Sequence, residues 1–320
     1  MEIISNPKHD DIKRAAKALK DGHLVAFPTE TVYGLGADAT NQTAVSRLYS
    51  VKARPTNHPL IVHVSSLNQL EKWTLKIPEY AIKLAKDFWP GPVTLILTRS
   101  NLAKNFLTGS QDSVGLRVPS HPLALELLEL FEKIGGGGIA APSANRFGAV
   151  SPTRVEAVKD EIGKNLEVND LILDGGDAKV GIESTIIDCT GTYPIILRPG
   201  AITQEMIFKT TKLETKVGGM GSGIRASGML PRHYSPNTPL VIGSDAALGD
   251  GYLALSSFPT PKGSVRLASP NTVTEFAQQM YQAIRDADRL GLVRIVVSPP
   301  PGDGLALAIR DRLTRAAKDV

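Results

Sequence analysis

Residues 1–208 alternate between helical patterns and short apolar runs, and each segment is bounded by Gly, Pro or Asn. This mixture predicts an α/β or α+β domain built on a twisted, mixed sheet. The predicted helices cover residues 10–20, 42–51, 78–87, 122–133 and 153–160. The predicted strands cover residues 23–27, 60–64, 93–98, 114–118, 139–141, 171–173, 184–189 and 195–197.

The pattern changes over residues 209–235, where apolar periodicity is lost. Five glycines fall within eleven residues there: Gly218, Gly219, Gly221, Gly223 and Gly228. This composition predicts a Gly-rich linker or mobile loop. Regular alternation returns in residues 236–320, which are expected to form a smaller α/β domain. Its predicted strands are 240–242, 252–255, 265–268 and 293–297, and its predicted helices are 273–290 and 305–317.

Cysteine usage and hydropathy exclude several classes of protein. Cys189 is the only cysteine, so the chain cannot form an internal disulfide, and no Cys/His cluster has zinc-ligand spacing. No apolar run approaches the ~18 residues that a membrane span needs. We therefore expect a cytoplasmic globular protein with no membrane partner, in which Cys189 lies in the core.

Polar clusters interrupt or directly follow several of the predicted apolar strands, where α/β proteins commonly bind ligands. They supply cations and neutral hydrogen-bonding groups, but no nucleophile paired with a base. The cations are Lys52, Arg54, Arg117 and Arg198. The neutral groups are Thr31, Ser113, Ser143, Asn145, Ser151 and Ser184. This set suits a polyanion together with a small polar ligand.

Each cluster also has an ordinary structural explanation. The hydroxyls near Thr31 could cap a turn, and Lys52 and Arg54 could complement the dipole at a helix C-terminus. His63 could be a core histidine with its hydrogen bonds satisfied. Arg117 lies on an apolar strand, so its guanidinium needs an anionic partner, either an internal carboxylate or a ligand.

Taken together, the clusters resemble a known family. In order along the chain they read PTETVYGLG (28–36), KARP (52–55), PLIVHV (59–64), LRVP (116–119), APSAN (141–145) and ESTIID (183–188). This series resembles the YrdC-type catalytic domain of L-threonylcarbamoyladenylate synthases. The segment MLPRHYSP (229–236) is similar to a motif of that family's longer, two-domain form. The resemblance implies a YrdC-like catalytic domain over 1–208, a linker or lid over 209–235, and a Rossmann-like domain over 236–320.

The resemblance also implies a reaction, in which L-threonine, bicarbonate and ATP give threonylcarbamoyl-AMP and pyrophosphate. Mg²⁺ is the expected cofactor, held mainly by the ATP phosphates. tRNA threonylcarbamoyl-transferase proteins are the expected partners that use the adenylate to make N6-threonylcarbamoyladenosine in tRNA. Direct tRNA binding is possible but not required.

The matched motifs assign site residues by resemblance. The family's basic and polar cluster, taken as catalytic, corresponds to Lys52, Arg54, Ser143 and Asn145. The threonine site corresponds to Thr31, His63, Arg117, Ala141 and Ser184. The ATP site corresponds to Arg54, His58, Ser113, Ser143, Ser151, Arg198 and Tyr234. His58 is a departure, because such proteins commonly carry Asn or Lys at this position.

Tyr234 lies in the linker, so its role implies that the linker folds back over the nucleotide and excludes water. The net charge of +4 fits this interpretation, because residues 209–235 hold five Lys or Arg and one Glu, whereas the rest of the chain is nearly balanced. The basic character is therefore expected to act near a triphosphate.

Two other functions remain open at this stage. One is an RNA-binding maturation factor, although aromatic residues make up only 5% of the chain and no Arg-rich stretch is present. The other is a carbamoyl-adenylate enzyme that uses an acceptor other than threonine.

Overall fold

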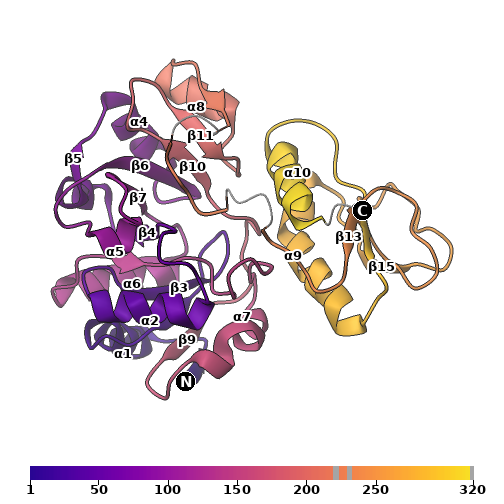
Figure 1. Cartoon of the computed structure of the whole chain (residues 1–320), viewed down its shortest axis with the longest axis horizontal. Coiled ribbons are helices and arrows are strands. Elements are labelled where there is room, and N and C mark those ends of the chain that lie inside the picture. The colour runs from indigo at the N-terminus through magenta and orange to yellow at the C-terminus, as the bar shows by residue number, and fades with distance from the viewer. Residues whose placement is uncertain (219–222, 229–232, 318–320) are drawn as a thin grey trace.

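The computed structural model describes residues 1–218, 223–228 and 233–317. Figure 1 shows a larger α/β unit and a smaller α/β unit. The chain between them falls within the predicted linker, and we call its described residues 223–228 and 233–235 the connecting segment. Part of the predicted linker and part of the motif at 229–236 lie outside the described residues: Gly219, Gly221 and residues 229–232.

The larger unit is built on a twelve-stranded mixed sheet. In spatial order its strands are β1 (Glu2–Ser5), β9 (Leu171–Asp174), β2 (Val25–Phe27), β3 (Gly34–Asp38), β8 (Ile139–Ala140), β4 (Ile61–His63), β7 (Ser113–Arg117), β6 (Val93–Arg99), β10 (Thr185–Asp188), β11 (Ile195–Arg198) and β12 (Lys216–Val217), with β5 (Thr74–Lys76) paired to β6. The predicted twisted, mixed sheet is confirmed.

Helices cover this sheet with apolar faces. They are α1 (His9–Lys20), α2 (Gln42–Lys52), α3 (Leu70–Trp73), α4 (Glu79–Phe88), α5 (Asn105–Thr108), α6 (Pro122–Lys133), α7 (Val155–Ile162) and α8 (Gln204–Thr211), with 3-10 turns at Leu67–Gln69 and Gly163–Asn165. In α1 the buried residues Ile12, Ala15, Ala16 and Leu19 recur at helical spacing and pack with α6 against the sheet.

Every helix and strand predicted for the larger unit is present within a few residues of its expected bounds. The sequence patterns missed β1, β3, β5, β12, α3, α5 and α8. β3 reads GLGAD and has too few apolar side chains to be recognised as a strand. A Cβ at Gly36 would lie 2.8 Å from Ile139 Cγ2, so close packing requires glycine there. The last turn of α8 and all of β12 lie within residues 209–235, where no regular element was expected.

The smaller unit has a four-stranded sheet in the order β13 (Leu240–Ile242), β16 (Ile295–Val297), β14 (Gly251–Leu253) and β15 (Val265–Ala268). All of its strand pairs are parallel, as expected for a Rossmann-like sheet. Its helices are α9 (Val273–Leu290) and α10 (Leu305–Ala316). The Thr272 hydroxyl caps α9 by accepting a hydrogen bond from the Glu275 N–H, and Gly291 ends the helix in the left-handed conformation.

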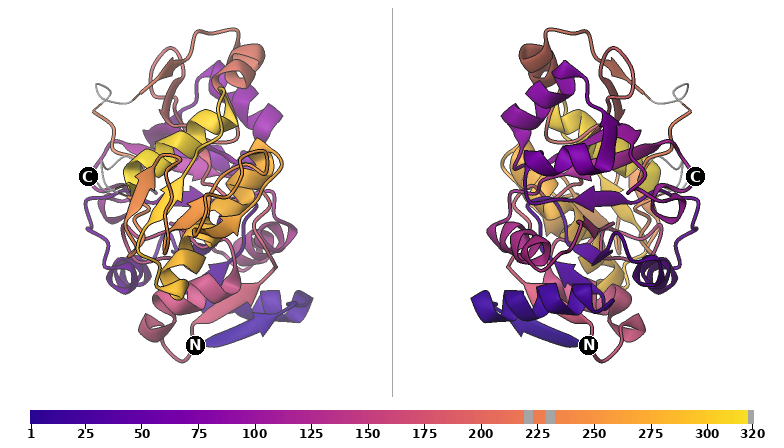
Figure 2. Two further views of the ribbon diagram at one scale, coloured as in Figure 1. Left: turned by 90° about the vertical axis from the view of Figure 1, so that its right-hand side faces the viewer. Right: turned by 90° about the vertical axis from the view of Figure 1, so that its left-hand side faces the viewer.

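The two units pack closely together. α9 and α10 lie between the small sheet and the larger unit (Figure 1). In the view turned by 90°, the smaller unit overlaps the larger unit (Figure 2). The core of the smaller unit continues into the larger one through Val32, Val150 and Ile182. Among the described residues, three ion pairs add to the interface: Arg285 with Glu161 at 2.8 Å, Arg289 with Asp160 at 2.7 Å and Arg312 with Glu183 at 2.9 Å.

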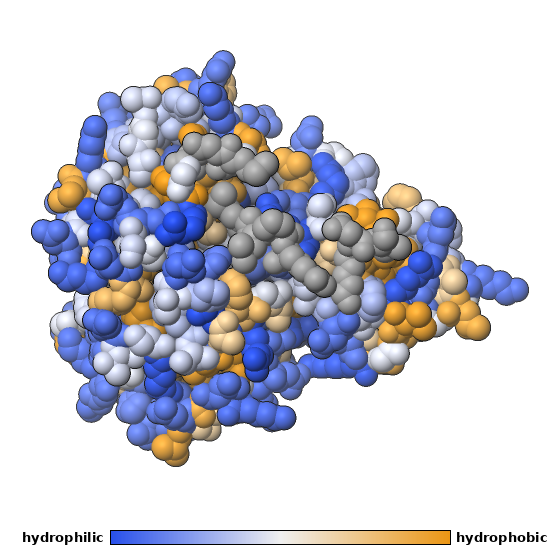
Figure 3. All heavy atoms as spheres, viewed as in Figure 1, coloured by the Kyte–Doolittle hydropathy of each residue, from blue (hydrophilic) through white to orange (hydrophobic). Residues whose placement is uncertain are grey.

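The outer surface is mainly hydrophilic. On the face in Figure 3, apolar side chains of the described residues form small, scattered groups. Among the residues that the structure describes, no helix is long and apolar enough to cross a membrane.

Gly181 provides a test of this close packing. It has a φ of +80°, and a Cβ there would lie 2.4 Å from the Ala277 carbonyl oxygen of α9. Gly176 has a φ of +83° but has no atom within 4 Å of such a Cβ, so it is a matched control for backbone strain. We expect Gly176→Ala to lower the free energy of unfolding by about 1 kcal/mol. Gly181→Ala should lower the free energy of unfolding by about 1–3 kcal/mol more than Gly176→Ala does, because α9 must shift.

Urea unfolding of both variants measures this difference. Equal destabilisation by the two substitutions would contradict the close approach of α9 to residue 181.

Candidate functional site

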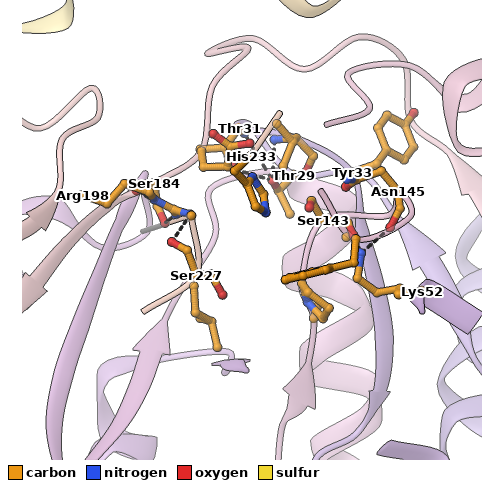
Figure 4. Close-up of a pocket in the computed structure, with 18 of the residues that line it drawn as sticks. Thr29, Thr31, Tyr33, Lys52, Ser143, Asn145, Ser184, Arg198, Ser227 and His233 are labelled. Atoms are coloured by element: carbon orange, nitrogen blue, oxygen red, sulfur yellow. Dashed lines mark hydrogen bonds between the residues drawn. The ribbon is translucent and has the colours of Figure 1, made fainter. Parts of the chain in front are cut away.

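Polar side chains within or next to the ends of six strands, β2, β4, β7, β8, β10 and β11, surround one cavity of about 50 Å³. His63 and Arg117 end the parallel strands β4 and β7 side by side, and Ser184 and Arg198 lie at the adjoining ends of β10 and β11. The loop after β8 joins them because Ser143 forms a bridge with Gly34 at the start of β3. Figure 4 shows Ser143, Ser184 and Arg198 around the cavity.

Eleven of the fourteen site residues predicted from the sequence line this cavity. They are Thr31, Lys52, Arg54, His63, Arg117, Ala141, Ser143, Asn145, Ser184, Arg198 and Tyr234. The other three, His58, Ser113 and Ser151, lie close to it but do not line it.

Lys52 fixes the loop after β8. Its buried ammonium donates to the Ser143 carbonyl at 2.5 Å and to the Asn145 carbonyl. Burial and the nearby Arg54 charge lower the pKa of Lys52 well below its ordinary value. Because two carbonyl oxygens accept its N–H groups, the lysine is a structural anchor for Ser143 and Asn145 at the cavity wall.

Arg54 and Arg198 approach the cavity from different elements and meet at one residue of the connecting segment. Arg54 donates to the Ser227 hydroxyl at 3.1 Å, and Arg198 donates to the Ser227 carbonyl at 3.0 Å. Arg198 also donates to the Ser184 carbonyl through Nε and a terminal nitrogen. Burial lowers the pKa of Arg54 to about 10. These arginines hold Ser227 with groups that could equally bind an anion.

Arg117 has an internal anionic partner. Its guanidinium donates to Glu30 Oε1 at 2.7 Å, and the Ser120 N–H donates to Glu30 Oε2 at 3.0 Å. The sequence left an internal carboxylate and a ligand as alternatives, and Glu30 provides the first. Arg117 Nε is buried and has no hydrogen-bond partner, so the guanidinium retains a donor at the cavity.

Unsatisfied polar atoms concentrate around this cavity. Among the described residues, ten buried side-chain atoms have no hydrogen-bond partner. Six belong to residues that line the cavity: Arg54, His63, Arg117, Asn145, His233 and Tyr234. An unsatisfied buried polar atom costs about 1–3 kcal/mol. This concentration therefore identifies a place where ligand atoms would complete the hydrogen bonding.

The remaining three predicted residues have distinct surroundings. His58 is half-buried and packs edge-on against Phe147, with ring centroids 5.1 Å apart. Ser113 is at the opposite end of β7 from Arg117, in a small neighbouring cavity that Ala226 and Ser227 also line. Ser151 is buried and donates to Glu183 at 2.5 Å.

Several cavity residues were not singled out from the sequence. Thr29 accepts from the Thr31 and Val32 N–H groups and so shapes the turn after β2. Glu183 and His233 lie within motifs that were noted, where their neighbours Ser184 and Tyr234 received the roles. No sequence signal pointed to Ser227.

A resident metal site was not found among the described residues, since no group of three His, Cys, Asp or Glu side chains there could hold an ion.

The fold and the cavity define a class: a YrdC-type α/β domain with a cavity lined by buried cations at its strand ends, extended by a smaller parallel α/β unit. Residues 17–200 match the Sua5/YciO/YrdC family, described as "Telomere recombination". Residues 202–318 match the family described as "Threonylcarbamoyl-AMP synthase, C-terminal domain".

Similar proteins share this two-part organisation. The chain is 38% identical over 325 residues to the threonylcarbamoyl-AMP synthase of Pyrococcus abyssi, covering 96% of this chain and 94% of that protein. It is 37% identical over 330 residues to that of Bacillus subtilis, covering 96% and 92%. The crystal structure of P. abyssi Sua5 complexed with L-threonine superposes with a TM-score of 0.88 at 36% identity, covering 100% of both chains.

A shorter relative matches the larger unit. Escherichia coli YciO superposes with a TM-score of 0.53 at 26% identity, covering 62% of this chain and 95% of that chain. The chain belongs to the family of threonylcarbamoyl-AMP synthases in their two-domain form.

The buried histidine at the end of β4 makes stability depend on pH. Burial, reinforced by the Arg117 charge, lowers the pKa of His63 to about 3. Below pH 6.5 the unfolded chain binds a proton at this residue that the folded chain does not bind. The free energy of unfolding should therefore fall as the pH drops from 6.5 to 4.5, by up to about 1.4 kcal/mol per pH unit for this group.

Urea unfolding at several pH values measures this slope. In His63→Gln, the unfolding free energy should change less with pH over this range, because unfolding takes up one proton fewer than in the unsubstituted chain. This difference in slope does not depend on the stability of the variant at pH 7.5. An unchanged slope would contradict a neutral, buried His63.

Proposed function

We propose that this chain condenses L-threonine, bicarbonate and ATP to threonylcarbamoyl-AMP and pyrophosphate in the cavity described above. Family membership supplies the reaction. The observation that carries the proposal is the group of buried cations and unpaired donors around one cavity. The crystal structure of the P. abyssi relative with L-threonine supports threonine as one ligand.

In the proposed threonine site, Thr31, His63, Arg117, Ala141 and Ser184 contact the amino acid. Arg117 provides the charge for the threonine carboxylate, because its Nε is buried and unpaired while Glu30 occupies another nitrogen. Glu30 holds the guanidinium in one orientation, which reduces the entropy lost when the carboxylate binds.

In the proposed ATP site, Arg54, Arg198, Ser143 and Tyr234 line the cavity, and His58, Ser113 and Ser151 lie at its margins. Arg54 and Arg198 both donate to Ser227, and phosphate oxygens would replace these acceptors. Mg²⁺ would bind mainly to the ATP phosphates and offset their charge. Asn145, whose side-chain oxygen is buried and unpaired, could accept from a ligand or from metal-bound water.

The proposed chemistry needs no protein nucleophile. The threonine amine attacks the bicarbonate carbon, and loss of water gives a carbamate. A carbamate oxygen then attacks the α-phosphorus of ATP, and the bond to the pyrophosphate oxygen breaks. The side chains position the three substrates and neutralise the negative charge that develops on pyrophosphate.

The connecting segment must move for the nucleotide to bind. A cavity of about 50 Å³ is far below the ~300 Å³ or more of typical small-molecule sites. Ser227, Gly228, His233 and Tyr234 form one of its walls. We infer that the part of this segment with Ser227 and Gly228 withdraws to admit ATP and closes over it, in agreement with the lid expected from the sequence, while Tyr234 stays in place.

The product also suggests partners and a location. An acyl adenylate hydrolyses readily, so a transferase that carries the group to tRNA should act nearby. We propose that these tRNA threonylcarbamoyl-transferase proteins and this chain meet in the cytoplasm.

Pyrophosphate release tests the proposed reaction. The purified chain with ATP, Mg²⁺, bicarbonate and L-threonine should release pyrophosphate, and omission of threonine or bicarbonate should abolish release. Release only with another amine would assign a different acceptor. No release with any amine, despite ATP binding, would contradict the proposed function.

Arg117 can be tested without leaving a buried charge unpaired. In the double variant Glu30→Gln with Arg117→Met, both partners of the ion pair are neutral. We expect KM for threonine to rise at least 100-fold, because the carboxylate loses its charge partner. The ATP dissociation constant, measured by calorimetry, should change less than threefold.

The single variant Glu30→Gln retains the guanidinium and serves as the control, with a KM for threonine within tenfold of the unsubstituted chain. Equal loss of threonine and ATP binding in the double variant would show that Arg117 has been assigned to the wrong substrate.

A further inference from the structure

A buried polar cluster connects the smaller unit to the cavity wall. Glu183 lines the cavity and accepts hydrogen bonds from three side chains. Ser151 donates to Glu183 Oε1 at 2.5 Å, Arg312 of α10 donates to Oε2 at 2.9 Å, and the Tyr281 hydroxyl of α9 lies 3.2 and 3.0 Å from the two oxygens. We call Glu183, Ser151, Tyr281 and Arg312 the interdomain cluster.

Charge balance explains why Glu183 needs a partner from the other unit. Burial alone would raise its pKa, but the charges of Arg312 and Arg198 and the hydrogen bonds from Ser151 and Arg312 lower it to about 2. Glu183 is therefore ionised at neutral pH. A bare carboxylate at this wall would repel an anionic ligand, and Arg312 neutralises it.

Arg312 is held firmly within its surroundings. It is 1% exposed, and its terminal nitrogens donate to Asp311 at 2.6 Å and to the Pro199 carbonyl at 2.9 Å. Pro199 directly follows Arg198 at the end of β11. The same guanidinium therefore contacts both the carboxylate at the cavity and the backbone next to a cavity arginine.

The cluster also holds the tyrosine of the connecting segment. The Tyr234 ring stacks on Tyr281 with centroids 5.9 Å apart, and the Arg312 guanidinium lies 5.4 Å from the Tyr234 centroid. The Tyr234 hydroxyl is buried without a hydrogen-bond partner and reaches Gly228, where a Cβ would be 2.2 Å from it. Two side chains of the smaller unit thus fix the ring that presents this hydroxyl to the cavity.

We propose that Arg312 and Tyr281 are positioning residues for the nucleotide, so that the smaller unit completes the ATP site rather than only packing beside it. Arg312 neutralises and orients Glu183, and Glu183 orients the Ser151 hydroxyl. Together Tyr281 and Arg312 hold Tyr234. This inference rests on the proposed function for the identity of the ligand as ATP.

Arg289 supplies a matched control. It forms the interdomain ion pair with Asp160 at 2.7 Å, but it is half exposed and does not line the cavity. Arg289→Met removes an interdomain ion pair of the smaller unit without changing the charge at the cavity. A role of Arg312 in docking alone predicts that Arg312→Met, like Arg289→Met, changes KM for ATP and KM for threonine to the same degree.

Steady-state kinetics on the full chain separates positioning from docking. We expect Arg312→Met to raise KM for ATP at least tenfold and KM for threonine less than twofold, and Arg289→Met to leave both within twofold. Tyr281→Phe keeps the stacked ring but loses the bonds to Glu183, and should raise KM for ATP threefold to tenfold. Adding Glu183→Gln to Arg312→Met removes the unbalanced carboxylate. The double variant should therefore reverse at least a third of the rise in KM for ATP that Arg312→Met causes.

Parallel rises in both KM values, equal effects of Arg312→Met and Arg289→Met, or no recovery in the double variant would overturn the inference. If Arg312→Met does not fold, Tyr281→Phe and Arg312→Lys test the same point.

ATP calorimetry separates this inference from the proposed function. Normal ATP binding without pyrophosphate release contradicts only the reaction, and the variants are then compared by ATP affinity. Absence of ATP binding to the unsubstituted chain would overturn both.

Discussion

Burial of positive charge without enough internal negative charge is the constraint on which this site depends. Among the described residues, Lys52, Arg54, Arg117 and Arg198 are buried at the cavity, and Glu183 is the one carboxylate that lines it. The Glu30 carboxylate neutralises the charge of Arg117, while Lys52 and Arg54 donate hydrogen bonds mainly to carbonyl oxygens. Desolvated cations of this kind are stable only with strong partners, so the fold favours an anionic ligand at this place.

The fold meets this constraint by joining segments that are far apart in the sequence. Strand pairing brings His63 beside Arg117, and a backbone bridge brings Ser143 beside Gly34. The smaller unit adds Arg312, more than 120 residues beyond Glu183 in the chain. The connecting segment supplies Ser227 as an acceptor for two arginines. In this conformation the protein's own groups therefore occupy bonds that the ligand would make.

Much of this arrangement could be predicted from the sequence, because the motifs lie at strand ends. Thr31 follows an apolar run, Arg117 interrupts one, Ser184 opens one and Lys52 ends a helix, and the α/β pattern predicted the regular elements around them. The series of motifs, rather than any single residue, indicated the family.

Other features depended on contacts that a local pattern does not encode. Glu30 lies within the motif at 28–36, and the fold places its carboxylate against Arg117. Arg312 lies within the predicted helix 305–317, and it is buried because α10 docks against the larger unit. β3 was missed because close packing of glycine, rather than apolar periodicity, makes it a strand. In each case the determining partner comes from a distant part of the chain.

The most direct test of the account is a crystal structure of the chain with a non-hydrolysable ATP analogue and L-threonine. The account predicts phosphate oxygens bound to Arg54 and Arg198, with Ser227 displaced from both arginines and the threonine carboxylate at Arg117. A nucleotide bound elsewhere, with the Arg54–Ser227 and Arg198–Ser227 contacts intact, would contradict the claim that these buried cations form the nucleotide site.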